Sequence, residues 1–432
     1  MRGNDRARIE SASIKKKYVW VAVLTMTTIV YLLPYTYNDF YNHFLEAFHI
    51  TDGQAGKVLT FFGLTATPGY FIGGWLADKF NPKRLVVIST LGTGLCGFWL
   101  SFCQSYTMLM VIYFLFGITT TCMHWGAFLK MIKSWGTPEE QGRLFGVENS
   151  MFGAVGLIST YVILGLITFL FKDAGFRGGI QVYAAVTLIT GIATWLFVPY
   201  DDEAKVDMGE DKIDFRVIGK VMKMPVAWYL GAFTWGYFMV RSTVPYLNPL
   251  MTDVYGIGIA LAAFITTTLR SGMNMIFGPI GGYFIDRHGR STPVVLFGSI
   301  ATLIFTVVIV LIPKQPDLFV LFLCIAILVT VSSYLNSSAL YTPVTEARVP
   351  IAYVGTVLGF ASTLGYSTDA WIYNVCGRWI DNYGSAAYNY IFMLQAFGAV
   401  IMIISGILLA KLYKRAQAKE KAVQSADQGE IA

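Results

Sequence analysis

Three charged side chains lie inside long apolar segments of this chain and raise the first question about its chemistry. Arg241, Arg270 and Asp369 are each flanked by residues typical of a membrane interior. Charged groups in hydrocarbon are costly and usually face a polar cavity, so each is a candidate for function. A guanidinium offers paired donors that match a carboxylate, sulfonate or phosphate. The two arginines therefore predict an anion-binding site.

A second interpretation of these charges stays open. Arg270 and Asp369 could form an internal ion pair, either structural or sensitive to protonation. Arg241 could extend its long side chain toward the membrane surface while its stem stays among apolar groups. The sequence does not decide among these roles.

Polar residues also gather around two prolines, Pro34 and Pro245, in apolar segments half a chain apart. A proline loosens a membrane helix, and the freed carbonyls and nearby phenols suit a binding site. The candidates are Tyr31, Tyr35, Asn38 and Asp39 in the first segment, and Arg241 and Asn248 in the second. An interfacial aromatic belt is the alternative, above all for Tyr37 and Tyr41.

Two further titratable residues, His124 and Glu148, lie in apolar segments. A buried carboxylate or a histidine can exchange protons near neutral pH. They join Asp39 and Asp369 as candidates for proton coupling or ion pairing. The simpler alternatives are a hydrogen-bonded packing role for His124 and a pairing of Glu148 with Lys130 or Arg143.

The composition defines the setting in which these residues act. Hydrophobic residues make up 55% of the 432 residues and charged residues 13%, whereas a soluble domain is about one quarter charged. Mean hydropathy is +0.56. The chain is therefore predicted to be a polytopic membrane protein. The net charge of +6 comes from loops and tails and does not suggest nucleic-acid binding, and the five cysteines match no metal motif. We expect no cofactor, no metal and no enzymatic activity.

Apolar segments long enough to cross a bilayer number twelve, in two groups of six. The predicted fold is an all-α membrane protein with two six-helix repeats. Its expected parts are a cytoplasmic tail (1–17), an N-terminal bundle (18–199), a central cytoplasmic loop (200–224), a C-terminal bundle (225–412) and a second cytoplasmic tail (413–432). The expected spans are 18–39, 54–77, 84–103, 106–129, 143–171, 179–199, 225–250, 258–285, 292–312, 317–343, 352–376 and 384–412.

Lysine and arginine predict the orientation. Most of the 32 basic residues fall in the two tails, the central loop and alternate short connections. The positive-inside rule then places both termini in the cytoplasm of a bacterial inner membrane.

Two stretches of the sequence are similar to each other: GGWLADKFNPKR, which starts at Gly73, and GGYFIDRHGR, which starts at Gly281. Each copy follows the second span of its half. Each is preceded by two glycines four residues apart, and such small residues let helices approach closely in lipid. The two halves are therefore expected to be parallel repeats of six helices, with the same loop on the same side of the membrane. Some transporters are built from repeats of this kind.

These loops resemble the G-x-L-x-D-x-x-G-[RK] motif of the major facilitator superfamily. The matching residues are Gly74, Asp78, Lys79 and Arg84 in the first copy, and Gly282, Asp286, Arg287 and Arg290 in the second. Asn81 stands where the motif usually has glycine. The resemblance covers about residues 18 to 412 and implies that the loops help to close a cytoplasmic gate. A tight turn with positive-inside charge is the alternative, and the two roles are compatible.

Departures from known branches narrow the resemblance. The fourth span lacks the arginine and the fifth lacks the Gly-Pro pair of drug–proton antiporters. The first and second spans lack the arginines of organophosphate antiporters and nitrate porters. The stretches PEEQGRLFG, PYLNPLMTDVYG and GYSTDAW are similar to a bacterial branch of sugar-acid and organic-anion carriers, the YihN-like group.

The expected function is secondary active transport of a small organic anion (a sugar acid, carboxylate or sulfonate) by alternating access, with proton symport. The alternatives are an organophosphate or anion exchanger, and a transporter-like sensor that binds ligand without flux. No nucleotide-binding Gly-x4-Gly-Lys-Ser/Thr motif points to ATP. The expected partners are an anionic substrate, protons and the lipid bilayer, and the expected state is a monomer.

Overall fold

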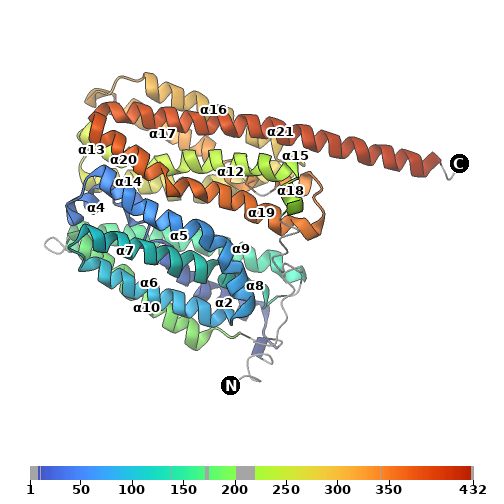
Figure 1. Ribbon diagram of the computed structural model, residues 1–432, viewed down its shortest axis with the longest axis horizontal. Coiled ribbons are helices and arrows are strands. Elements are labelled where there is room, and N and C mark those ends of the chain that lie inside the picture. Colours follow the sequence, from blue (N-terminus) through green and yellow to red (C-terminus); the bar gives the residue numbers. More distant parts are fainter. Residues whose placement is uncertain are drawn as a thin grey trace. The chain divides into compact units, whose positions relative to one another are not determined.

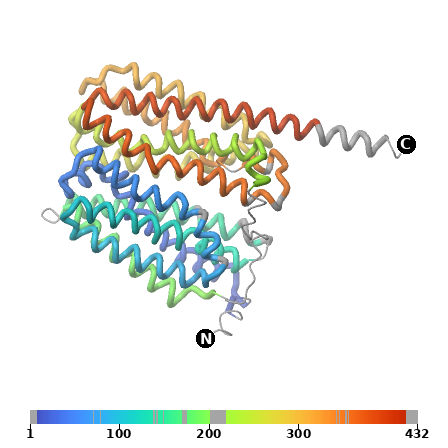
Figure 2. The backbone as a smooth tube through the Cα atoms, viewed as in Figure 1, coloured from blue at the N-terminus to red at the C-terminus, as the bar shows by residue number. Residues whose placement is uncertain are grey.

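The computed structural model describes residues 8–9, 11–136, 138–170, 175–200, 219–340 and 342–429. Within these ranges every regular element is a helix (Figures 1 and 2). Contacts divide the chain into two compact units. Unit 1 consists of Met1–Met208, Pro245–Gly272 and Asp369–Tyr388, and unit 2 consists of Gly209–Val244, Met273–Thr368 and Asn389–Ala432.

Unit 1 contains the first half of the chain and two segments of the second half. Its helices are α2 (Ile14–Met26), η1 (Thr27–Tyr31), α3 (Thr36–Asp39), α4 (Tyr41–Phe48), α5 (Asp52–Lys79), α6 (Pro82–Ser101), α7 (Tyr106–Gly117), η2 (Ile118–Trp125), α8 (Gly126–Lys133), α9 (Pro138–Gly165), η3 (Leu166–Leu170), α10 (Gly175–Phe197), α13 (Leu247–Asp253), α14 (Ile259–Thr267), η5 (Thr268–Gly272), α20 (Ile372–Tyr383) and η9 (Gly384–Ala386). Residues far apart in sequence therefore share one packed body.

Unit 2 is built on an apolar core that includes the buried residues Phe233, Tyr237, Tyr334 and Met402. Its helices are α12 (Pro225–Thr243), α15 (Met273–His288), α16 (Thr292–Leu311), η6 (Pro316–Leu318), α17 (Phe319–Tyr334), η7 (Ser337–Ala339), α18 (Pro343–Glu346), α19 (Ile351–Tyr366) and α21. The last of these, α21, runs from Ala387 to Gly429 and extends past its neighbours in unit 2 (Figure 1). The short helices η4 (Val244–Tyr246) and η8 (Ser367–Ala370) lie where the chain passes between units.

Eight helical stretches of the described residues are long and apolar enough to cross a membrane. Seven correspond one to one with expected spans, and the eighth, Thr356–Ala418, contains the expected spans 352–376 and 384–412 in large part. The expected spans 18–39, 54–77 and 225–250 fall outside these eight. The first is divided among α2, η1 and α3 around Pro34, so no single helix reaches the length of a span. The count of twelve remains a prediction.

Glycines bring α5 and α20 into backbone contact in unit 1. A Cβ atom on Gly56 would lie 2.2 Å from the carbonyl oxygen of Tyr373, and one on Gly377 would lie 2.2 Å from that of Asp52. A Cβ on Gly63 would lie 2.7 Å from the Cα of Ala370. Only glycine fits at these positions, which is how small residues let membrane helices approach closely.

Several π-helical segments interrupt the long helices of unit 1, and two of them, η2 and η5, carry residues chosen from the sequence. The segment η2 follows α7 and carries His124, and η5 follows α14 and carries Arg270. A π-turn is rare and often marks a functional position, because its wider turn reorients side chains. Two of the residues chosen from sequence therefore lie on irregular backbone.

Candidate functional site

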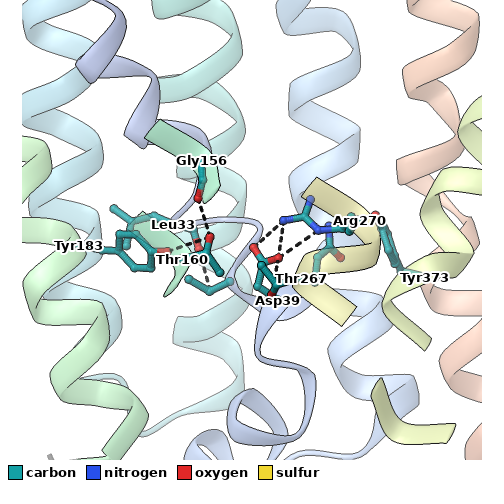
Figure 3. A network of polar contacts seen from close by, with 10 residues as sticks. Leu33, Asp39, Gly156, Thr160, Tyr183, Thr267, Arg270 and Tyr373 are labelled. Atoms are coloured by element: carbon teal, nitrogen blue, oxygen red, sulfur yellow. Dashed lines mark hydrogen bonds and ion pairs between the residues drawn. The ribbon is translucent and has the colours of Figure 1, made fainter. Parts of the chain in front are cut away.

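The centre of the site is an ion pair between Asp39 and Arg270 (Figure 3). The Arg270 Nη2 lies 2.5 Å from Asp39 Oδ2 and 2.6 Å from Oδ1, and Nε donates to Oδ1 at 3.1 Å. The Thr267 hydroxyl donates to the same Oδ1 at 3.4 Å. Only 2% of the Asp39 side chain and 10% of the Arg270 side chain are exposed. The pair is thus charge-assisted, multidentate and largely desolvated.

Local structure explains how these two side chains meet. Helix α2 gives way to the 3-10 turn η1, and Pro34 follows before the short helix α3, whose last residue is Asp39. Arg270 lies in the middle of η5, and Thr267 ends α14 just before it. Both partners therefore lie on interrupted helices, where freed backbone groups suit a polar site.

Asp369 belongs to the same unit and accepts a hydrogen bond from a tyrosine of the first segment. The Tyr35 hydroxyl donates to Asp369 Oδ2 at 2.8 Å, and Asp369 is 6% exposed. The carboxylate that binds the Arg270 guanidinium through both oxygens belongs to Asp39. A pairing of Arg270 with Asp369, which the sequence left open, stays a prediction. The break around Pro34 places Asp39 beside η5, and local sequence gives no sign of that placement.

Tyr31 and His124 form a second polar group of unit 1. The Tyr31 hydroxyl lies 3.1 Å from His124 Nδ1, and Thr27 Oγ1 lies 2.8 Å from Nε2. The imidazole is fully buried and stacks on Phe128, with ring centroids 5.4 Å apart. The structure therefore brings two expected site residues together through direct hydrogen bonding.

Buried tyrosines connect the two proline segments. The Tyr37 hydroxyl donates to Tyr246 Oη at 3.2 Å, and Tyr246 donates to the Tyr373 carbonyl at 3.0 Å. The Asn38 amide donates to Tyr373 Oη at 3.4 Å. Tyr37 and Tyr41 are fully buried, so the aromatic-belt interpretation is wrong for both. Tyr373 was missed in the sequence, whereas the position of Tyr246 beside Pro245 was a usable signal.

The remaining expected residues are dispersed. Asn248 is fully buried on α13, and within the described residues neither of its amide atoms has a hydrogen-bond partner. Arg241 belongs to unit 2, where its guanidinium lies 5.5 Å from the Phe238 ring centroid. Glu148 is buried on α9, and Lys130 donates to the Ala77 carbonyl at 3.0 Å.

The first copy of the repeated loop is closed by an asparagine cap. The Asn81 side chain accepts from the Arg84 amide at 2.9 Å and caps α6, which begins at Pro82. Lys79 lies 4.3 Å from the Trp75 ring centroid, and Gly74 has open space around it. Asp78 lies on α5, and its side chain is outside the described part of the chain.

The second copy turns through a glycine instead. Gly289 has φ +64°, a conformation that glycine adopts without steric cost. The Ser291 amide then donates to the Glu346 carboxylate of α18, and Asp286, Arg287 and Arg290 are exposed. A Cβ atom added to Gly282 would lie 3.4 Å from Ser338 Oγ. Asn81 thus replaces glycine in the first copy because its side chain starts the next helix, with φ −60°.

An acidic group at the start of α5 was missed in the sequence. Asp381 Oδ2 accepts from the Thr51 hydroxyl at 2.7 Å and from the Gly53 amide at 3.0 Å. The Tyr41 hydroxyl donates to Asp52 Oδ1, and Tyr388 donates to Asp253 Oδ2 at 2.8 Å. Burial raises the pKa of Asp52 to about 6, with a further increase from Asp381 and Asp253.

Among the described residues, no group of three or more His, Cys, Asp or Glu side chains is arranged to hold a metal ion.

Several helices long and apolar enough to span a membrane define the class of a polytopic membrane protein. The sequence profile of the Major Facilitator Superfamily matches residues 19–371 and 236–429. The chain belongs to this superfamily, so it is a transporter and not an enzyme.

Curated relatives agree with this assignment. The inner membrane protein YihN of Escherichia coli is 24% identical over 404 residues, covering 92% of this chain and 96% of the relative. The cis,cis-muconate transport protein of Acinetobacter baylyi is 24% identical over 84% of this chain and 86% of its own length. The probable sulfoacetate transporter SauU of Cupriavidus necator is 30% identical over 33% of this chain and 32% of its own length.

Solved structures share the fold. A bacterial homologue of the human lysosomal transporter Spinster, in an inward-facing and occupied conformation, has a TM-score of 0.67 at 15% identity, with 94% of this chain and 98% of that chain covered. The nucleoside transporter NupG has a TM-score of 0.69 at 11% identity, with 91% and 99% covered. With relatives named as inner membrane proteins, the chain is a multi-pass inner membrane protein.

Proposed function

We propose that this transporter moves a small organic anion by alternating access and that a proton crosses with it. One observation carries the proposal: the Arg270 guanidinium is buried in unit 1, and its partner there is the carboxylate of Asp39. A guanidinium binds a substrate carboxylate or sulfonate with the same paired donors that it now uses for Asp39.

Competition for Arg270 links the anion to the proton. A second anion beside the guanidinium would leave Asp39 with an uncompensated charge, and a buried charge without a partner costs several kcal/mol. Protonation of Asp39 removes that cost and frees donors of Arg270 for the substrate. Anion and proton therefore bind together and are released together, which is symport.

Two relatives support the substrate class. The relatives named for sulfoacetate and for cis,cis-muconate both transport organic anions, according to their names. Tyr35 donates to Asp369, and both belong to the same unit as the ion pair. We include Tyr31, Tyr35 and Asn38 in the substrate site because they precede Asp39 closely in the chain and contact buried polar groups of this unit.

A flux assay in proteoliposomes with an imposed pH gradient tests the proposal. The panel consists of small carboxylates, sulfonates, sugar phosphates and neutral sugars, with a pH-sensitive dye inside. We expect uptake of an organic anion together with internal acidification. Arg270→Ala should abolish both, Arg270→Lys should retain little, and Arg415→Ala, at an exposed position of α21, is the matched control.

Each other outcome has a distinct meaning. Anion uptake that needs a counter-anion inside, without proton movement, indicates an exchanger. Ligand binding without flux indicates a sensor. Uptake of neutral sugars alone, unchanged in Arg270→Ala, removes Arg270 from the substrate site and overturns the proposal.

A further inference from the structure

His124 connects two irregular segments of unit 1. The imidazole projects from the π-helical segment η2 and contacts the 3-10 segment η1 at both of its ends. Its Nε2 lies 2.8 Å from the Oγ1 of Thr27, the first residue of η1, and its Nδ1 lies 3.1 Å from the hydroxyl of Tyr31, the last. One buried ring therefore spans the whole of η1.

The hydrogen bonds fix the form of the imidazole. The Thr27 hydroxyl has one proton and donates it to the Leu24 carbonyl at 2.6 Å, so Thr27 Oγ1 can only accept from the ring. Nε2 then carries the ring proton, and Nδ1 accepts from the Tyr31 hydroxyl. His124 is neutral in this arrangement, with both nitrogens satisfied.

The segment that carries His124 is itself fixed against α5. A Cβ on Gly69 would lie 2.4 Å from Thr121 Oγ1, and a Cβ on Gly126 would lie 2.8 Å from the Gly73 carbonyl. The imidazole also stacks on Phe128, with an interplanar angle of 19°. η2 is thus a closely packed support, and His124 extends it toward η1.

The segment on the other side of His124 leads into the substrate site. The Tyr31 ring meets the imidazole edge-on, with ring centroids 5.4 Å apart. It also meets the Trp125 ring edge-on, with centroids 6.1 Å apart. After Tyr31 the chain passes Pro34 and reaches Tyr35 and then Asp39. The position of Tyr31 therefore fixes where the broken stretch begins.

We propose that His124 is a positioning residue for transport: as a neutral ring it orients the Tyr31 hydroxyl and anchors the start of the segment that carries Asp39. It does not carry the coupled proton. This inference rests on the proposed function, because Tyr31 and Asp39 are taken as parts of the substrate site.

Transport kinetics of four variants test this role. His124→Gln keeps a donor for Thr27 Oγ1 but does not reproduce the acceptor position of Nδ1. Tyr31→Phe removes the hydroxyl that donates to Nδ1. We expect each to raise KM for the anion about three- to tenfold, the range expected for losing one hydrogen bond. The KM of the double variant should not exceed the higher of the two single-variant values, since both substitutions remove the same contact. Tyr106→Phe, which loses a hydroxyl bond to the Gln54 carbonyl outside the site, is the control and should leave KM unchanged.

The pH dependence separates positioning from proton transfer. In His124→Gln we expect the pH profile of transport and the proton-to-anion ratio to match the wild type. Uncoupled anion flux, or a flattened profile, would overturn the proposal. Fully additive effects of His124→Gln and Tyr31→Phe on KM would also overturn it.

A spectroscopic measurement keeps the inference distinct from the proposed function. The chain has four histidines, so 15N-histidine NMR of the full protein in nanodiscs is tractable, with His124 assigned from its loss in His124→Gln. We expect the neutral Nε2–H tautomer from pH 5.5 to 8, and a mixture of tautomers in Thr27→Val. Titration of His124 within that range refutes the inference even if no substrate is found. An unchanged tautomer without any flux instead counts against the proposed function.

Discussion

Unit 1 contains carboxylates in two contrasting surroundings. Asp39 ends the short helix α3 and meets the opposite charge of Arg270. Asp52, Asp253 and Asp381 gather at the start of α5, where their contacts are hydroxyl groups and a backbone amide. The first group is balanced by a cation, and the second is an accumulation of like charge.

The two surroundings differ in the change to which their carboxylates respond. A second anion can compete with the Asp39 carboxylate for the guanidinium of Arg270, so under the proposed function this region responds to a ligand. A half-buried carboxylate near two others has its pKa raised, to about 6 for Asp52, so the acidic group responds to pH. The four predictions below test this contrast.

The largest effect is expected from Arg270→Ala. It leaves the Asp39 charge buried and unpaired, which costs about 3–5 kcal/mol. The purified variant should melt well below the wild type. Adding Asp39→Asn should restore most of the lost thermal stability but no transport. A double variant as unstable as Arg270→Ala would show that charge balance does not define this region.

The next largest loss of stability is expected at the close contact between α5 and α20, where the acidic group lies. Gly56→Ala and Gly377→Ala each place a Cβ 2.2 Å from a backbone oxygen across the α5–α20 contact. Such overpacking typically costs about 1–3 kcal/mol. Thermal unfolding in detergent should show both losses, whereas Gly74→Ala, with nothing within 4 Å of the added atom, should unfold like the wild type.

Asp52→Asn should change how stability depends on pH. The folded protein holds the Asp52 proton up to about pH 6, and the unfolded chain releases it near 3.8. Asp52 therefore favours the folded state more as pH falls through 6, and its contribution to the pH dependence fades about one unit above that value. Between pH 6 and 5 we expect the wild type to gain about 1 kcal/mol relative to Asp52→Asn. Parallel melting curves for the two proteins across this range would contradict the assignment.

The smallest effect is expected from Asp381→Ala. It removes the acceptor of the Thr51 hydroxyl and the Gly53 amide at the first turn of α5, a loss of about 1 kcal/mol. Asp317→Ala, which removes an exposed acid of η6, is the control for loss of charge alone. Equal stability of the two variants would mean that Asp381 does not act as a helix cap.

The sequence was informative where single residues conflict with their surroundings. Arg270 and Asp369 were identified because a charge in an apolar segment is anomalous by itself, and Asp39 because it follows Pro34 among other polar residues. Their pairing was not predictable, because it depends on how the break at Pro34 turns α3 toward η5, more than two hundred positions along the chain.

The repeated loop and the acidic group show the limits of sequence patterns in another way. The motif placed both loops at helix ends but did not reveal that Asn81 caps a helix where Gly289 makes a left-handed turn. The acidic group was missed because Asp52, Asp253 and Asp381 come from three distant segments. Each of these carboxylates reads locally as an ordinary loop residue.

The length of α21 has a practical consequence for experiments. From Ala387 to Ala418 the helix measures about 48 Å at 1.5 Å per residue, whereas the hydrocarbon core of a bilayer is about 30 Å thick. The basic residues Lys411, Lys414 and Arg415 lie in the part that exceeds this thickness. A rigid reporter joined without a break near Ala418 would turn with the helix, so its orientation would report movements of unit 2 during transport.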